Sequence, residues 1–278
     1  MGRGAGKPEV ERVQYILEQA VEQLKEIRQL ILVGARPPVA YFAAPGKNAV
    51  LTSPECEIFT LASGGQDCAG ALEGLSKALS PGKSQADGNR AERPSLPAGE
   101  ISLSGLSTAV GALLPESAIV VDESMTSGRG LMAATRGSLP HDWLANTGGS
   151  IGIALPLAVG AAIACPNRRI LCLTADGSAM YTAQALWTMA REALKVTTVV
   201  FANRSYAVLK REFSYLGVGD PGPHASSMFD IGRPDLDWVQ LARGMGVPAS
   251  RPTTLDEFGK ALRNGFESSG PTLIEVRV

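Results

Sequence analysis

The 278-residue sequence has few aromatic residues (5%), only two histidines and almost no net charge, because 26 Lys and Arg nearly balance 27 Asp and Glu. This composition argues against nucleic-acid binding through a broad basic surface. No apolar run approaches the roughly 18 residues that a membrane-spanning helix needs. The N-terminus, MGRGAGKPEV, has no apolar core like that of a secretory signal. We therefore expect a cytoplasmic protein without a nucleic-acid or membrane partner.

Several common chemical signatures are also missing. The four cysteines show no CxxC spacing, which favours free, buried thiols in a reducing compartment over metal ligands or disulfides. No Gly-x-Ser-x-Gly, HExxH or P-loop pattern occurs. The apolar run Leu30–Val33 ends at Gly34, but no GxGxxG pattern follows it. The sequence therefore disfavours an NAD-type oxidoreductase.

What the sequence does contain is a regular alternation of apolar runs and helical patterns, in a composition that is 45% hydrophobic and 19% charged. This is typical of a soluble α/β protein with one large or two medium domains. Residues 1–79 predict an incomplete α/β module, residues 80–99 a linker rich in Pro, Gly and polar residues, and residues 100–278 a longer α/β region. In the first region we expect helices at Val10–Arg28 and Asp67–Leu79 and strands at Leu30–Val33 and Glu57–Leu61.

In the longer region, apolar runs that predict strands alternate with helical spacing, as in a parallel sheet. The expected strands are Ala118–Val121, Trp143–Asn146, Ile170–Thr174, Val196–Phe201 and Thr272–Val278. The expected helices are Ile101–Leu114, Ile153–Ala164, residues 180–190, Tyr206–Phe213, Asp237–Gly244 and Thr254–Phe266, with a polar loop at Gly217–Pro223.

The most informative stretch joins two of these strands. One strand ends at Asp176-Gly177-Ser178, and the next ends at Asn203. The carboxyl ends of parallel strands are where open α/β sheets bind ligands. A carboxylate and a carboxamide there suit Mg²⁺, Gly177 lets a phosphate approach the backbone, and Ser178 opens a helix whose free N–H groups favour an anion. The simpler alternative is that Asp-Gly is only a turn, as a lone Asp-Gly-Ser more often is.

The spacing of these residues resembles the thiamin-diphosphate (ThDP) signature of 2-oxo-acid decarboxylases and acetolactate synthases. Asp176 and Asn203 are 27 positions apart (203 − 176), and Tyr206 completes the family's Asn-x-x-Tyr pattern. The family usually begins the motif with Gly where this chain has Ala175. The resemblance implies ThDP and Mg²⁺ as cofactors. It implies Asp176, Asn203 and the backbone carbonyl of Ser205 as metal ligands, with Gly177, Ser178 and Tyr206 at the cofactor.

A second part of the resemblance is Thr147–Gly152, a glycine-rich turn before a helix. From the residues alone, a tight turn into a closely packed helix would explain the glycines. The resemblance implies that the segment holds the aminopyrimidine of ThDP. The backbone carbonyl of Gly149 would accept its amino group, Ser150 would lie beside it, and Ile151 would support the bent shape of the cofactor.

Two further predictions concern side chains near these segments. Ser124 and Thr126 follow a predicted strand, where hydroxyls either cap a helix or, as the resemblance implies, bind the diphosphate. His141 lies in a Pro-flanked setting, where a histidine is more often a surface residue. Its position just before Thr147–Gly152 keeps His141 as a weak catalytic candidate.

The resemblance implies a doubly wound diphosphate-binding domain over residues 100–278, preceded by a partial Rossmann-like central domain. It implies ThDP- and Mg²⁺-dependent decarboxylation or carboligation of a small-molecule 2-oxo acid, as in acetolactate-synthase-like or benzoylformate-decarboxylase-like enzymes. In this family, a Glu on the pyrimidine domain of a neighbouring chain activates the cofactor, and no segment here resembles that domain. We therefore expect a homo- or hetero-oligomer with a chain that bears a pyrimidine domain, and little activity alone. The alternatives are a non-catalytic ThDP-binding or assembly subunit and, less favoured, the NAD-type oxidoreductase.

Overall fold

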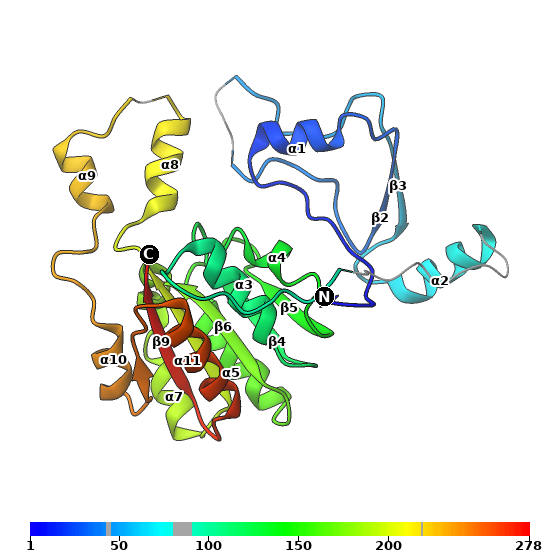
Figure 1. Cartoon of the computed structure of the whole chain (residues 1–278). Coiled ribbons are helices and arrows are strands. Elements are labelled where there is room, and N and C mark those ends of the chain that lie inside the picture. Colours follow the sequence, from blue (N-terminus) through cyan, green and yellow to red (C-terminus); the bar gives the residue numbers. More distant parts are fainter. Residues whose placement is uncertain (43–45, 80–90, 218) are drawn as a thin grey trace. The chain divides into compact units, whose positions relative to one another are not determined.

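The structure is a computed structural model that describes residues 1–42, 46–79, 91–217 and 219–278. These residues divide into two compact units (Figure 1). The small unit lies within residues 10–79, and the large unit consists of residues 1–9 together with 91–278. No described helix is long and apolar enough to cross a membrane.

The large unit is built on a seven-stranded sheet in the order β1-β5-β4-β6-β7-β9-β8, and all of its pairings are parallel except that of β1 with β5. Its strands are β1 (Gly2–Arg3), β4 (Ile119–Glu123), β5 (His141–Ala145), β6 (Ile170–Ala175), β7 (Val196–Ala202), β8 (Ala249–Ser250) and β9 (Thr272–Arg277). The predicted α/β fold with a parallel sheet is therefore confirmed.

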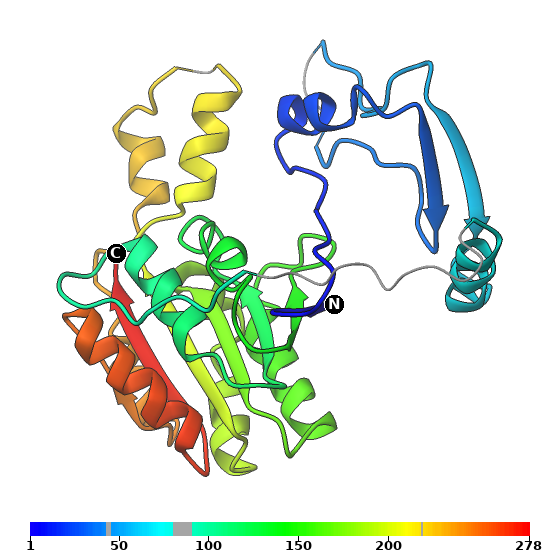
Figure 2. The same ribbon diagram turned by 45° about the vertical axis from the view of Figure 1, so that its right-hand side comes forward.

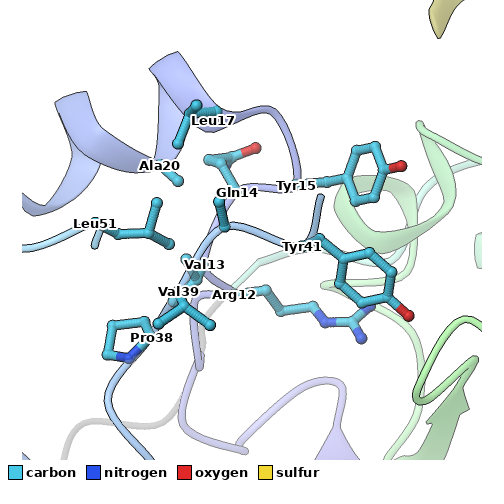
Figure 3. A pocket seen from close by; sticks show the side chains of 11 residues that line it. Arg12, Val13, Gln14, Tyr15, Leu17, Ala20, Pro38, Val39, Tyr41 and Leu51 are labelled. Atoms are coloured by element: carbon cyan, nitrogen blue, oxygen red, sulfur yellow. The ribbon is translucent and has the colours of Figure 1, made fainter. Parts of the chain in front are cut away.

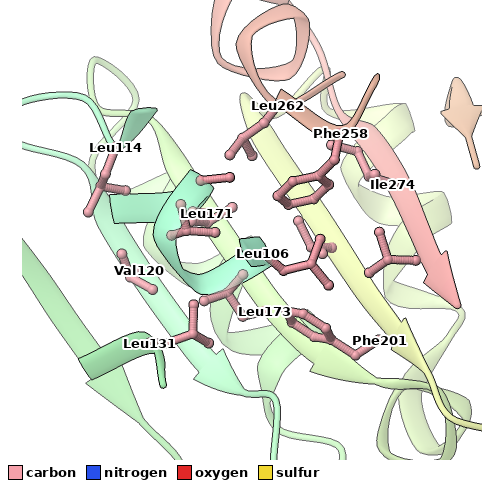
Figure 4. Close-up of a cluster of buried hydrophobic side chains, with 14 of the residues drawn as sticks. Leu106, Leu114, Val120, Leu131, Leu171, Leu173, Phe201, Phe258, Leu262 and Ile274 are labelled. Atoms are coloured by element: carbon pink, nitrogen blue, oxygen red, sulfur yellow. The ribbon is translucent and has the colours of Figure 1, made fainter. Parts of the chain in front are cut away.

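Helices cover both faces of this sheet. The helices of the large unit are α3 (Leu103–Leu113), α4 (Leu131–Ala134), α5 (Ala154–Ala164), α6 (Asp176–Ala179), the 3₁₀ turn η1 (Met180–Thr182), α7 (Ala185–Arg191), α8 (Ala207–Tyr215), α9 (Pro223–Phe229), α10 (Trp238–Gly244) and α11 (Leu255–Glu267). Side chains from α3, α4 and α11 pack on one face (Figure 4), and those from α5, α7 and α10 pack on the other. Successive residues of β6 alternate between the two cores, because neighbouring side chains of a strand point to opposite faces.

The order of the strands creates a switch point beside β4. The chain passes from β4 to β5 on one side, and then returns across β4 to β6 on its other side. Connections therefore diverge at the carboxyl ends of β4 and β6, which is where doubly wound sheets bind ligands. Helices α8 and α9 rise from the same edge, after β7 (Figure 2).

The small unit contains β2 (Gln29–Val33) and β3 (Glu57–Ala62), which pair in parallel, with α1 (Leu17–Leu24) and α2 (Cys68–Leu79). Both predicted strands and the second predicted helix are present. The predicted helix Val10–Arg28 is wrong at both ends, because α1 begins only at Leu17 and ends at Leu24. The side chain of Gln23 binds the backbone N–H of Gln14 and the carbonyl of Arg12, and so holds this N-terminal stretch outside the helix.

Other segments also differ from expectation. Residues 1–9 belong to the large unit, where β1 pairs with β5 and forms the edge strand of the sheet. Of the predicted linker, residues 80–90 lie outside the described residues. Its last part packs on the large unit. Leu96 contacts the core on the face covered by α3, α4 and α11, and the N–H of Gly99 donates to the carboxylate of Asp256. Helix α9 was not predicted, and of the four free thiols only that of Cys172 is buried.

Candidate functional site

The site begins where β6 ends. Asp176 is the first residue of α6 and is only 2% exposed. Its Oδ1 accepts a hydrogen bond from the backbone N–H of Gly177 at 2.9 Å, and its Oδ2 accepts one from the N–H of Arg204 at 2.7 Å. The second bond joins the end of β6 to the turn after β7. The predicted Asp176–Asn203 pair is therefore brought together in space.

The turn after β7 is itself tightly organised. The Oδ1 of Asn203 accepts the N–H of Ser205 at 3.0 Å, and the Oγ of Ser205 donates to the carbonyl of Phe229. The N–H groups of Leu209 and Lys210 donate to the carbonyl of Tyr206. Helix α8 therefore does not use the Ser205 carbonyl, which keeps this oxygen available as a ligand.

The electrostatics of Asp176 fit a cation. Burial raises the pKa of Asp176, and the backbone N–H groups of Arg204 and Gly177 only partly oppose this rise. No described Lys or Arg forms an ion pair with the carboxylate. Across the described ranges, no group of three or more His, Cys, Asp and Glu could hold a metal. A metal here would thus combine one carboxylate with amide and carbonyl oxygens, which is a donor set that suits Mg²⁺.

Gly177 is packed against Tyr206. A Cβ atom at position 177 would lie 2.7 Å from the Cε1 atom of Tyr206, so the aromatic ring leaves room only for glycine. The next residue, Ser178, is buried. Gly177 and Tyr206 therefore form a packed corner beside the candidate metal ligands, and the cofactor contacts of Gly177, Ser178 and Tyr206 stay a prediction.

The end of β4 carries the two predicted diphosphate ligands. Ser124 is buried, and its Oγ donates to Oδ1 of Asp122 at 2.5 Å, while Thr126 is half-buried in the following turn. Gly130 is the N-cap of α4, so the alternative that Ser124 or Thr126 caps a helix is wrong. Their binding of diphosphate stays a prediction.

The predicted aminopyrimidine segment forms a turn between β5 and α5. Gly148 and Gly149 have φ angles of 64° and 65°, a conformation that favours glycine. The carbonyl of Gly149 accepts the N–H of Ile151 at 2.9 Å and retains a second lone pair for a ligand. Ser150 and Ile151 are exposed, Ile151 by 42%, so both are accessible to a ligand at this edge.

Glu123 is a residue that the sequence analysis did not assign to the site. Its side chain is 2% exposed, and its two carboxylate oxygens accept the N–H groups of Gly152 at 2.6 Å and Ala154 at 2.9 Å. The sequence shows an acidic residue after an apolar run, but the helix that this carboxylate reaches begins about 30 residues later. Only the pairing of β4 with β5 reveals the contact.

His141 is placed away from this edge, so its assignment as a catalytic candidate is wrong. It is the first residue of β5, at the amino end of the strand, whereas the segment that follows β5 leaves its carboxyl end. The side chain is 3% exposed, and its Nδ1 bonds the carbonyl of Leu139. Histidine at this position belongs to the packing around the edge strand.

The small unit contains a pocket of about 470 Å³ (Figure 3). It is lined mainly by apolar side chains, with the polar ends of Arg12, Tyr15 and Tyr41 at its rim. None of the residues predicted to bind a cofactor lines it. Its size alone therefore does not identify it as the site, whereas the carboxyl edge of the large sheet brings the buried carboxylate of Asp176 next to Asn203 and Ser205.

Comparison with known proteins identifies the family of the chain. Residues 128–276, slightly more than half of the chain, match the family described as "Thiamine pyrophosphate enzyme, C-terminal TPP binding domain". IlvX of Mycobacterium tuberculosis, a relative named for acetolactate synthase large subunits, is 50% identical over 277 residues. That alignment covers 99% of this chain and 53% of IlvX.

Two further proteins are similar over different lengths. Benzoylformate decarboxylase of Pseudomonas aeruginosa is 33% identical over 168 residues, which cover 60% of this chain and 30% of that protein. The solved structure of a thiamine diphosphate-dependent 4-hydroxybenzoylformate decarboxylase from Rhodococcus jostii RHA1 superposes with a TM-score of 0.75 at 26% identity. It covers 96% of this chain and 51% of that one, so the chain spans about half the length of IlvX and of this decarboxylase.

Proposed function

Because this chain belongs to the thiamine pyrophosphate enzymes, we propose that its large unit binds ThDP with Mg²⁺ and takes part in decarboxylation or carboligation of a 2-oxo acid. One observation carries the proposal. The buried carboxylate of Asp176 is bonded to the N–H of Arg204, directly beside Asn203 and Ser205, at the carboxyl ends of β6 and β7. A carboxylate oxygen of Asp176, the side-chain oxygen of Asn203 and the backbone carbonyl oxygen of Ser205 would hold the metal.

Two groups of residues would bind the two ends of the cofactor. Gly177 and Ser178 would accommodate the diphosphate at the start of α6, together with Ser124 and Thr126 at the end of β4. The carbonyl of Gly149 would accept from the aminopyrimidine, with Ser150 beside it. Bound ThDP supplies an electron sink for the cleavage or formation of a bond next to a 2-oxo carbonyl.

Ile151 and Tyr206 would act by shape. The exposed side chain of Ile151 offers an apolar support beneath the bound cofactor, while the ring of Tyr206 closes the corner next to Gly177. Holding two reacting groups of one molecule close together lowers the entropic part of the barrier. The role of this segment is therefore geometric, whereas the metal ligands contribute affinity.

The carboxylate of Glu123 lies at the end of the aminopyrimidine segment, where its two oxygens already accept the backbone N–H groups of Gly152 and Ala154. It is not placed to exchange protons with a bound ring. We propose that the activating carboxylate comes from a pyrimidine domain outside these 278 residues. This domain would be supplied by another chain in a homo- or hetero-oligomer. We place the protein in the cytoplasm.

The same observation supports a second candidate, a ThDP-binding subunit without turnover of its own. The two candidates predict the same binding and differ in the reaction. The names of the relatives, acetolactate synthase and benzoylformate decarboxylase, support pyruvate and benzoylformate as the first 2-oxo acids to test.

The test is a decarboxylation assay with both substrates, ThDP and Mg²⁺. We expect negligible turnover by this chain alone and measurable turnover after addition of a separately expressed pyrimidine domain from a related enzyme. Changing the activating Glu of that domain to Gln should remove the rate again, because proton transfer by a placed group is worth about 10²–10⁴-fold. Binding of ThDP without turnover in the mixture would favour the non-catalytic subunit. Absence of ThDP binding would overturn both candidates.

A further inference from the structure

Both ends of the exposed turn Thr147–Ile151 are fastened to the end of β4. At its start, the N–H of Asn146 donates to the carbonyl of Asp122 at 3.2 Å. At its end, the N–H of Gly152 donates to the carboxylate of Glu123 at 2.6 Å. Between these points the turn makes only local backbone bonds, such as that from Ile151 to Gly149. Two neighbouring residues of β4 therefore set where this turn lies.

Gly152 is held on both of its polar sides. Its N–H reaches Glu123, and its carbonyl accepts the Oγ1 of Thr182 at 2.6 Å. Its φ angle is 91°, and a Cβ atom there would lie 2.6 Å from the Cβ atom of Tyr181. The conformation, the packing and both hydrogen bonds thus fix this residue, which directly follows Ile151.

We propose that Glu123 is a positioning residue for the aminopyrimidine end of the cofactor. Its buried carboxylate sets the distance between the turn Thr147–Ile151 and the hydroxyl of Ser124, the residue that directly follows β4. This inference rests on the proposed function, since the turn and Ser124 are its predicted aminopyrimidine and diphosphate contacts. Glu123 acts through Gly152 and does not touch the reacting atoms.

The chemistry of the contact explains why a carboxylate is needed. Burial raises the pKa of Glu123, while the N–H groups of Ala154, Gly152 and Ile153 lower it. Two N–H groups point at the two oxygens, and a carboxylate can accept both. A glutamine can accept only one, and its NH₂ group would oppose the other N–H. Glu123→Gln should therefore loosen one of the two bonds without a change in volume.

A purely structural role for Glu123, as an anchor of α5, would affect all ligands alike. The distinguishing measurement compares two ligands by calorimetry in the presence of Mg²⁺. ThDP requires both the diphosphate contacts and the turn, whereas inorganic pyrophosphate requires only the diphosphate contacts. We expect Glu123→Gln to weaken ThDP binding about tenfold and pyrophosphate binding by less than about twofold.

Two other variants complete the test. Thr182→Val removes the hydroxyl on the opposite side of Gly152, so it should cause the same ThDP-selective loss even if Glu123→Gln fails to fold. Glu275→Gln is the matched control. Its carboxylate is fully buried in β9, where it accepts the N–H of Val239 and pairs with Arg251 at 2.7 Å. It makes no bond to the turn, and any effect of its charge on Asp176 would act on both Mg²⁺-dependent ligands alike, so the ratio of the two affinities should not change.

Each outcome decides the proposal. A ThDP-selective loss in the Glu123 and Thr182 variants, with an unchanged ratio in the Glu275 variant, supports it. Equal losses for ThDP and pyrophosphate, or no loss, would overturn it and leave Glu123 as an anchor of α5. A wild-type chain that binds pyrophosphate or nothing, but not ThDP, would instead contradict the proposed function, and the role of Glu123 would fall with it.

Discussion

The carboxylate of Asp176 and the backbone N–H of Arg204 form a hydrogen bond of 2.7 Å that connects two strands through their following turns. Because Asn203 and Ser205 flank Arg204, this bond places the two residues next to the carboxylate. The candidate metal site is therefore part of the packing between the ends of β6 and β7. Its residues do not depend on a flexible loop for their arrangement.

His141 predicts a pH dependence of stability. Burial lowers its pKa, Arg3 lowers it further, and the Leu139 carbonyl and Asp142 partly oppose this. As pH falls through the ordinary histidine pKa of about 6.5, the unfolded chain takes up a proton that the folded chain does not. The free energy of unfolding should then fall, by at most about 1.4 kcal/mol per pH unit.

Urea denaturation between pH 8 and pH 5 checks this prediction. His141→Gln should flatten the decline near pH 6. The matched control is His224→Gln, a change of the exposed histidine in α9. This variant should keep the wild-type dependence of stability on pH. An unchanged decline in the His141 variant would show that another group is responsible.

Gly177 predicts a packing conflict. In a helix, Gly→Ala usually stabilises by up to about 1 kcal/mol. Here the new Cβ atom would lie 2.7 Å from the ring of Tyr206, and overpacking of this kind costs about 1–3 kcal/mol. We expect Gly177→Ala to lower the free energy of unfolding. The loss should be smaller when the same change is made in a Tyr206→Ala background.

The measurement is a double-mutant cycle by urea denaturation. Gly160→Ala in α5 is the control, because a Cβ atom there meets nothing within 4 Å and should be neutral or stabilising. Additive effects of the Gly177 and Tyr206 changes would mean that the two residues do not share the corner.

Much of the large unit could be predicted from the sequence, because its strands are apolar on both faces and its helices carry clear signals. The predicted helices Ile101–Leu114 and Thr254–Phe266 match α3 and α11, whose N-cap residues Ser102 and Thr254 each accept a backbone N–H group. The first turns of the predicted helix at Val10 failed, since a side-chain contact from Gln23 replaced the helical bonds. Spacing alone cannot reveal such a contact. Helix α9 was missed because its polar sequence shows no apolar face, and none of its residues is buried.

The site was predictable where its residues are close in sequence to a strand end. Asp176 and Asn203 each end a strand, and parallel pairing then brings them together. His141 was assigned from its distance to Thr147 along the chain, but β5 separates the two across the sheet. Glu123 was missed because its partners, Gly152 and Ala154, follow a different strand. Long-range pairing of this kind has no local signal.

Ile151 predicts a separation of catalysis from affinity. Since its side chain is 42% exposed, Ile151→Ala should change stability by less than about 1 kcal/mol. Binding of Mg²⁺ and pyrophosphate should stay at the wild-type level. Turnover in the assembly with a pyrimidine domain should fall, because the lost contact is one of geometry.

Ile163→Ala is the control for this change, since Ile163 is also exposed, on α5 beyond the turn. It should leave turnover unchanged. Equal turnover of the Ile151 variant and the wild type would show that Ile151 does not support the bent shape of the cofactor.

The central claim is that Asp176 holds the metal through which ThDP binds, and calorimetry of ThDP with and without Mg²⁺ tests it most directly. The wild-type chain should bind ThDP only with Mg²⁺, and Asp176→Asn should weaken this binding by at least about a hundredfold. Asp256→Asn, a change of an exposed carboxylate that accepts the N–H of Gly99, should bind as the wild type does. Thermal unfolding of each variant would reveal a folding defect. Mg²⁺-dependent binding of equal strength in a folded Asp176 variant would contradict the account.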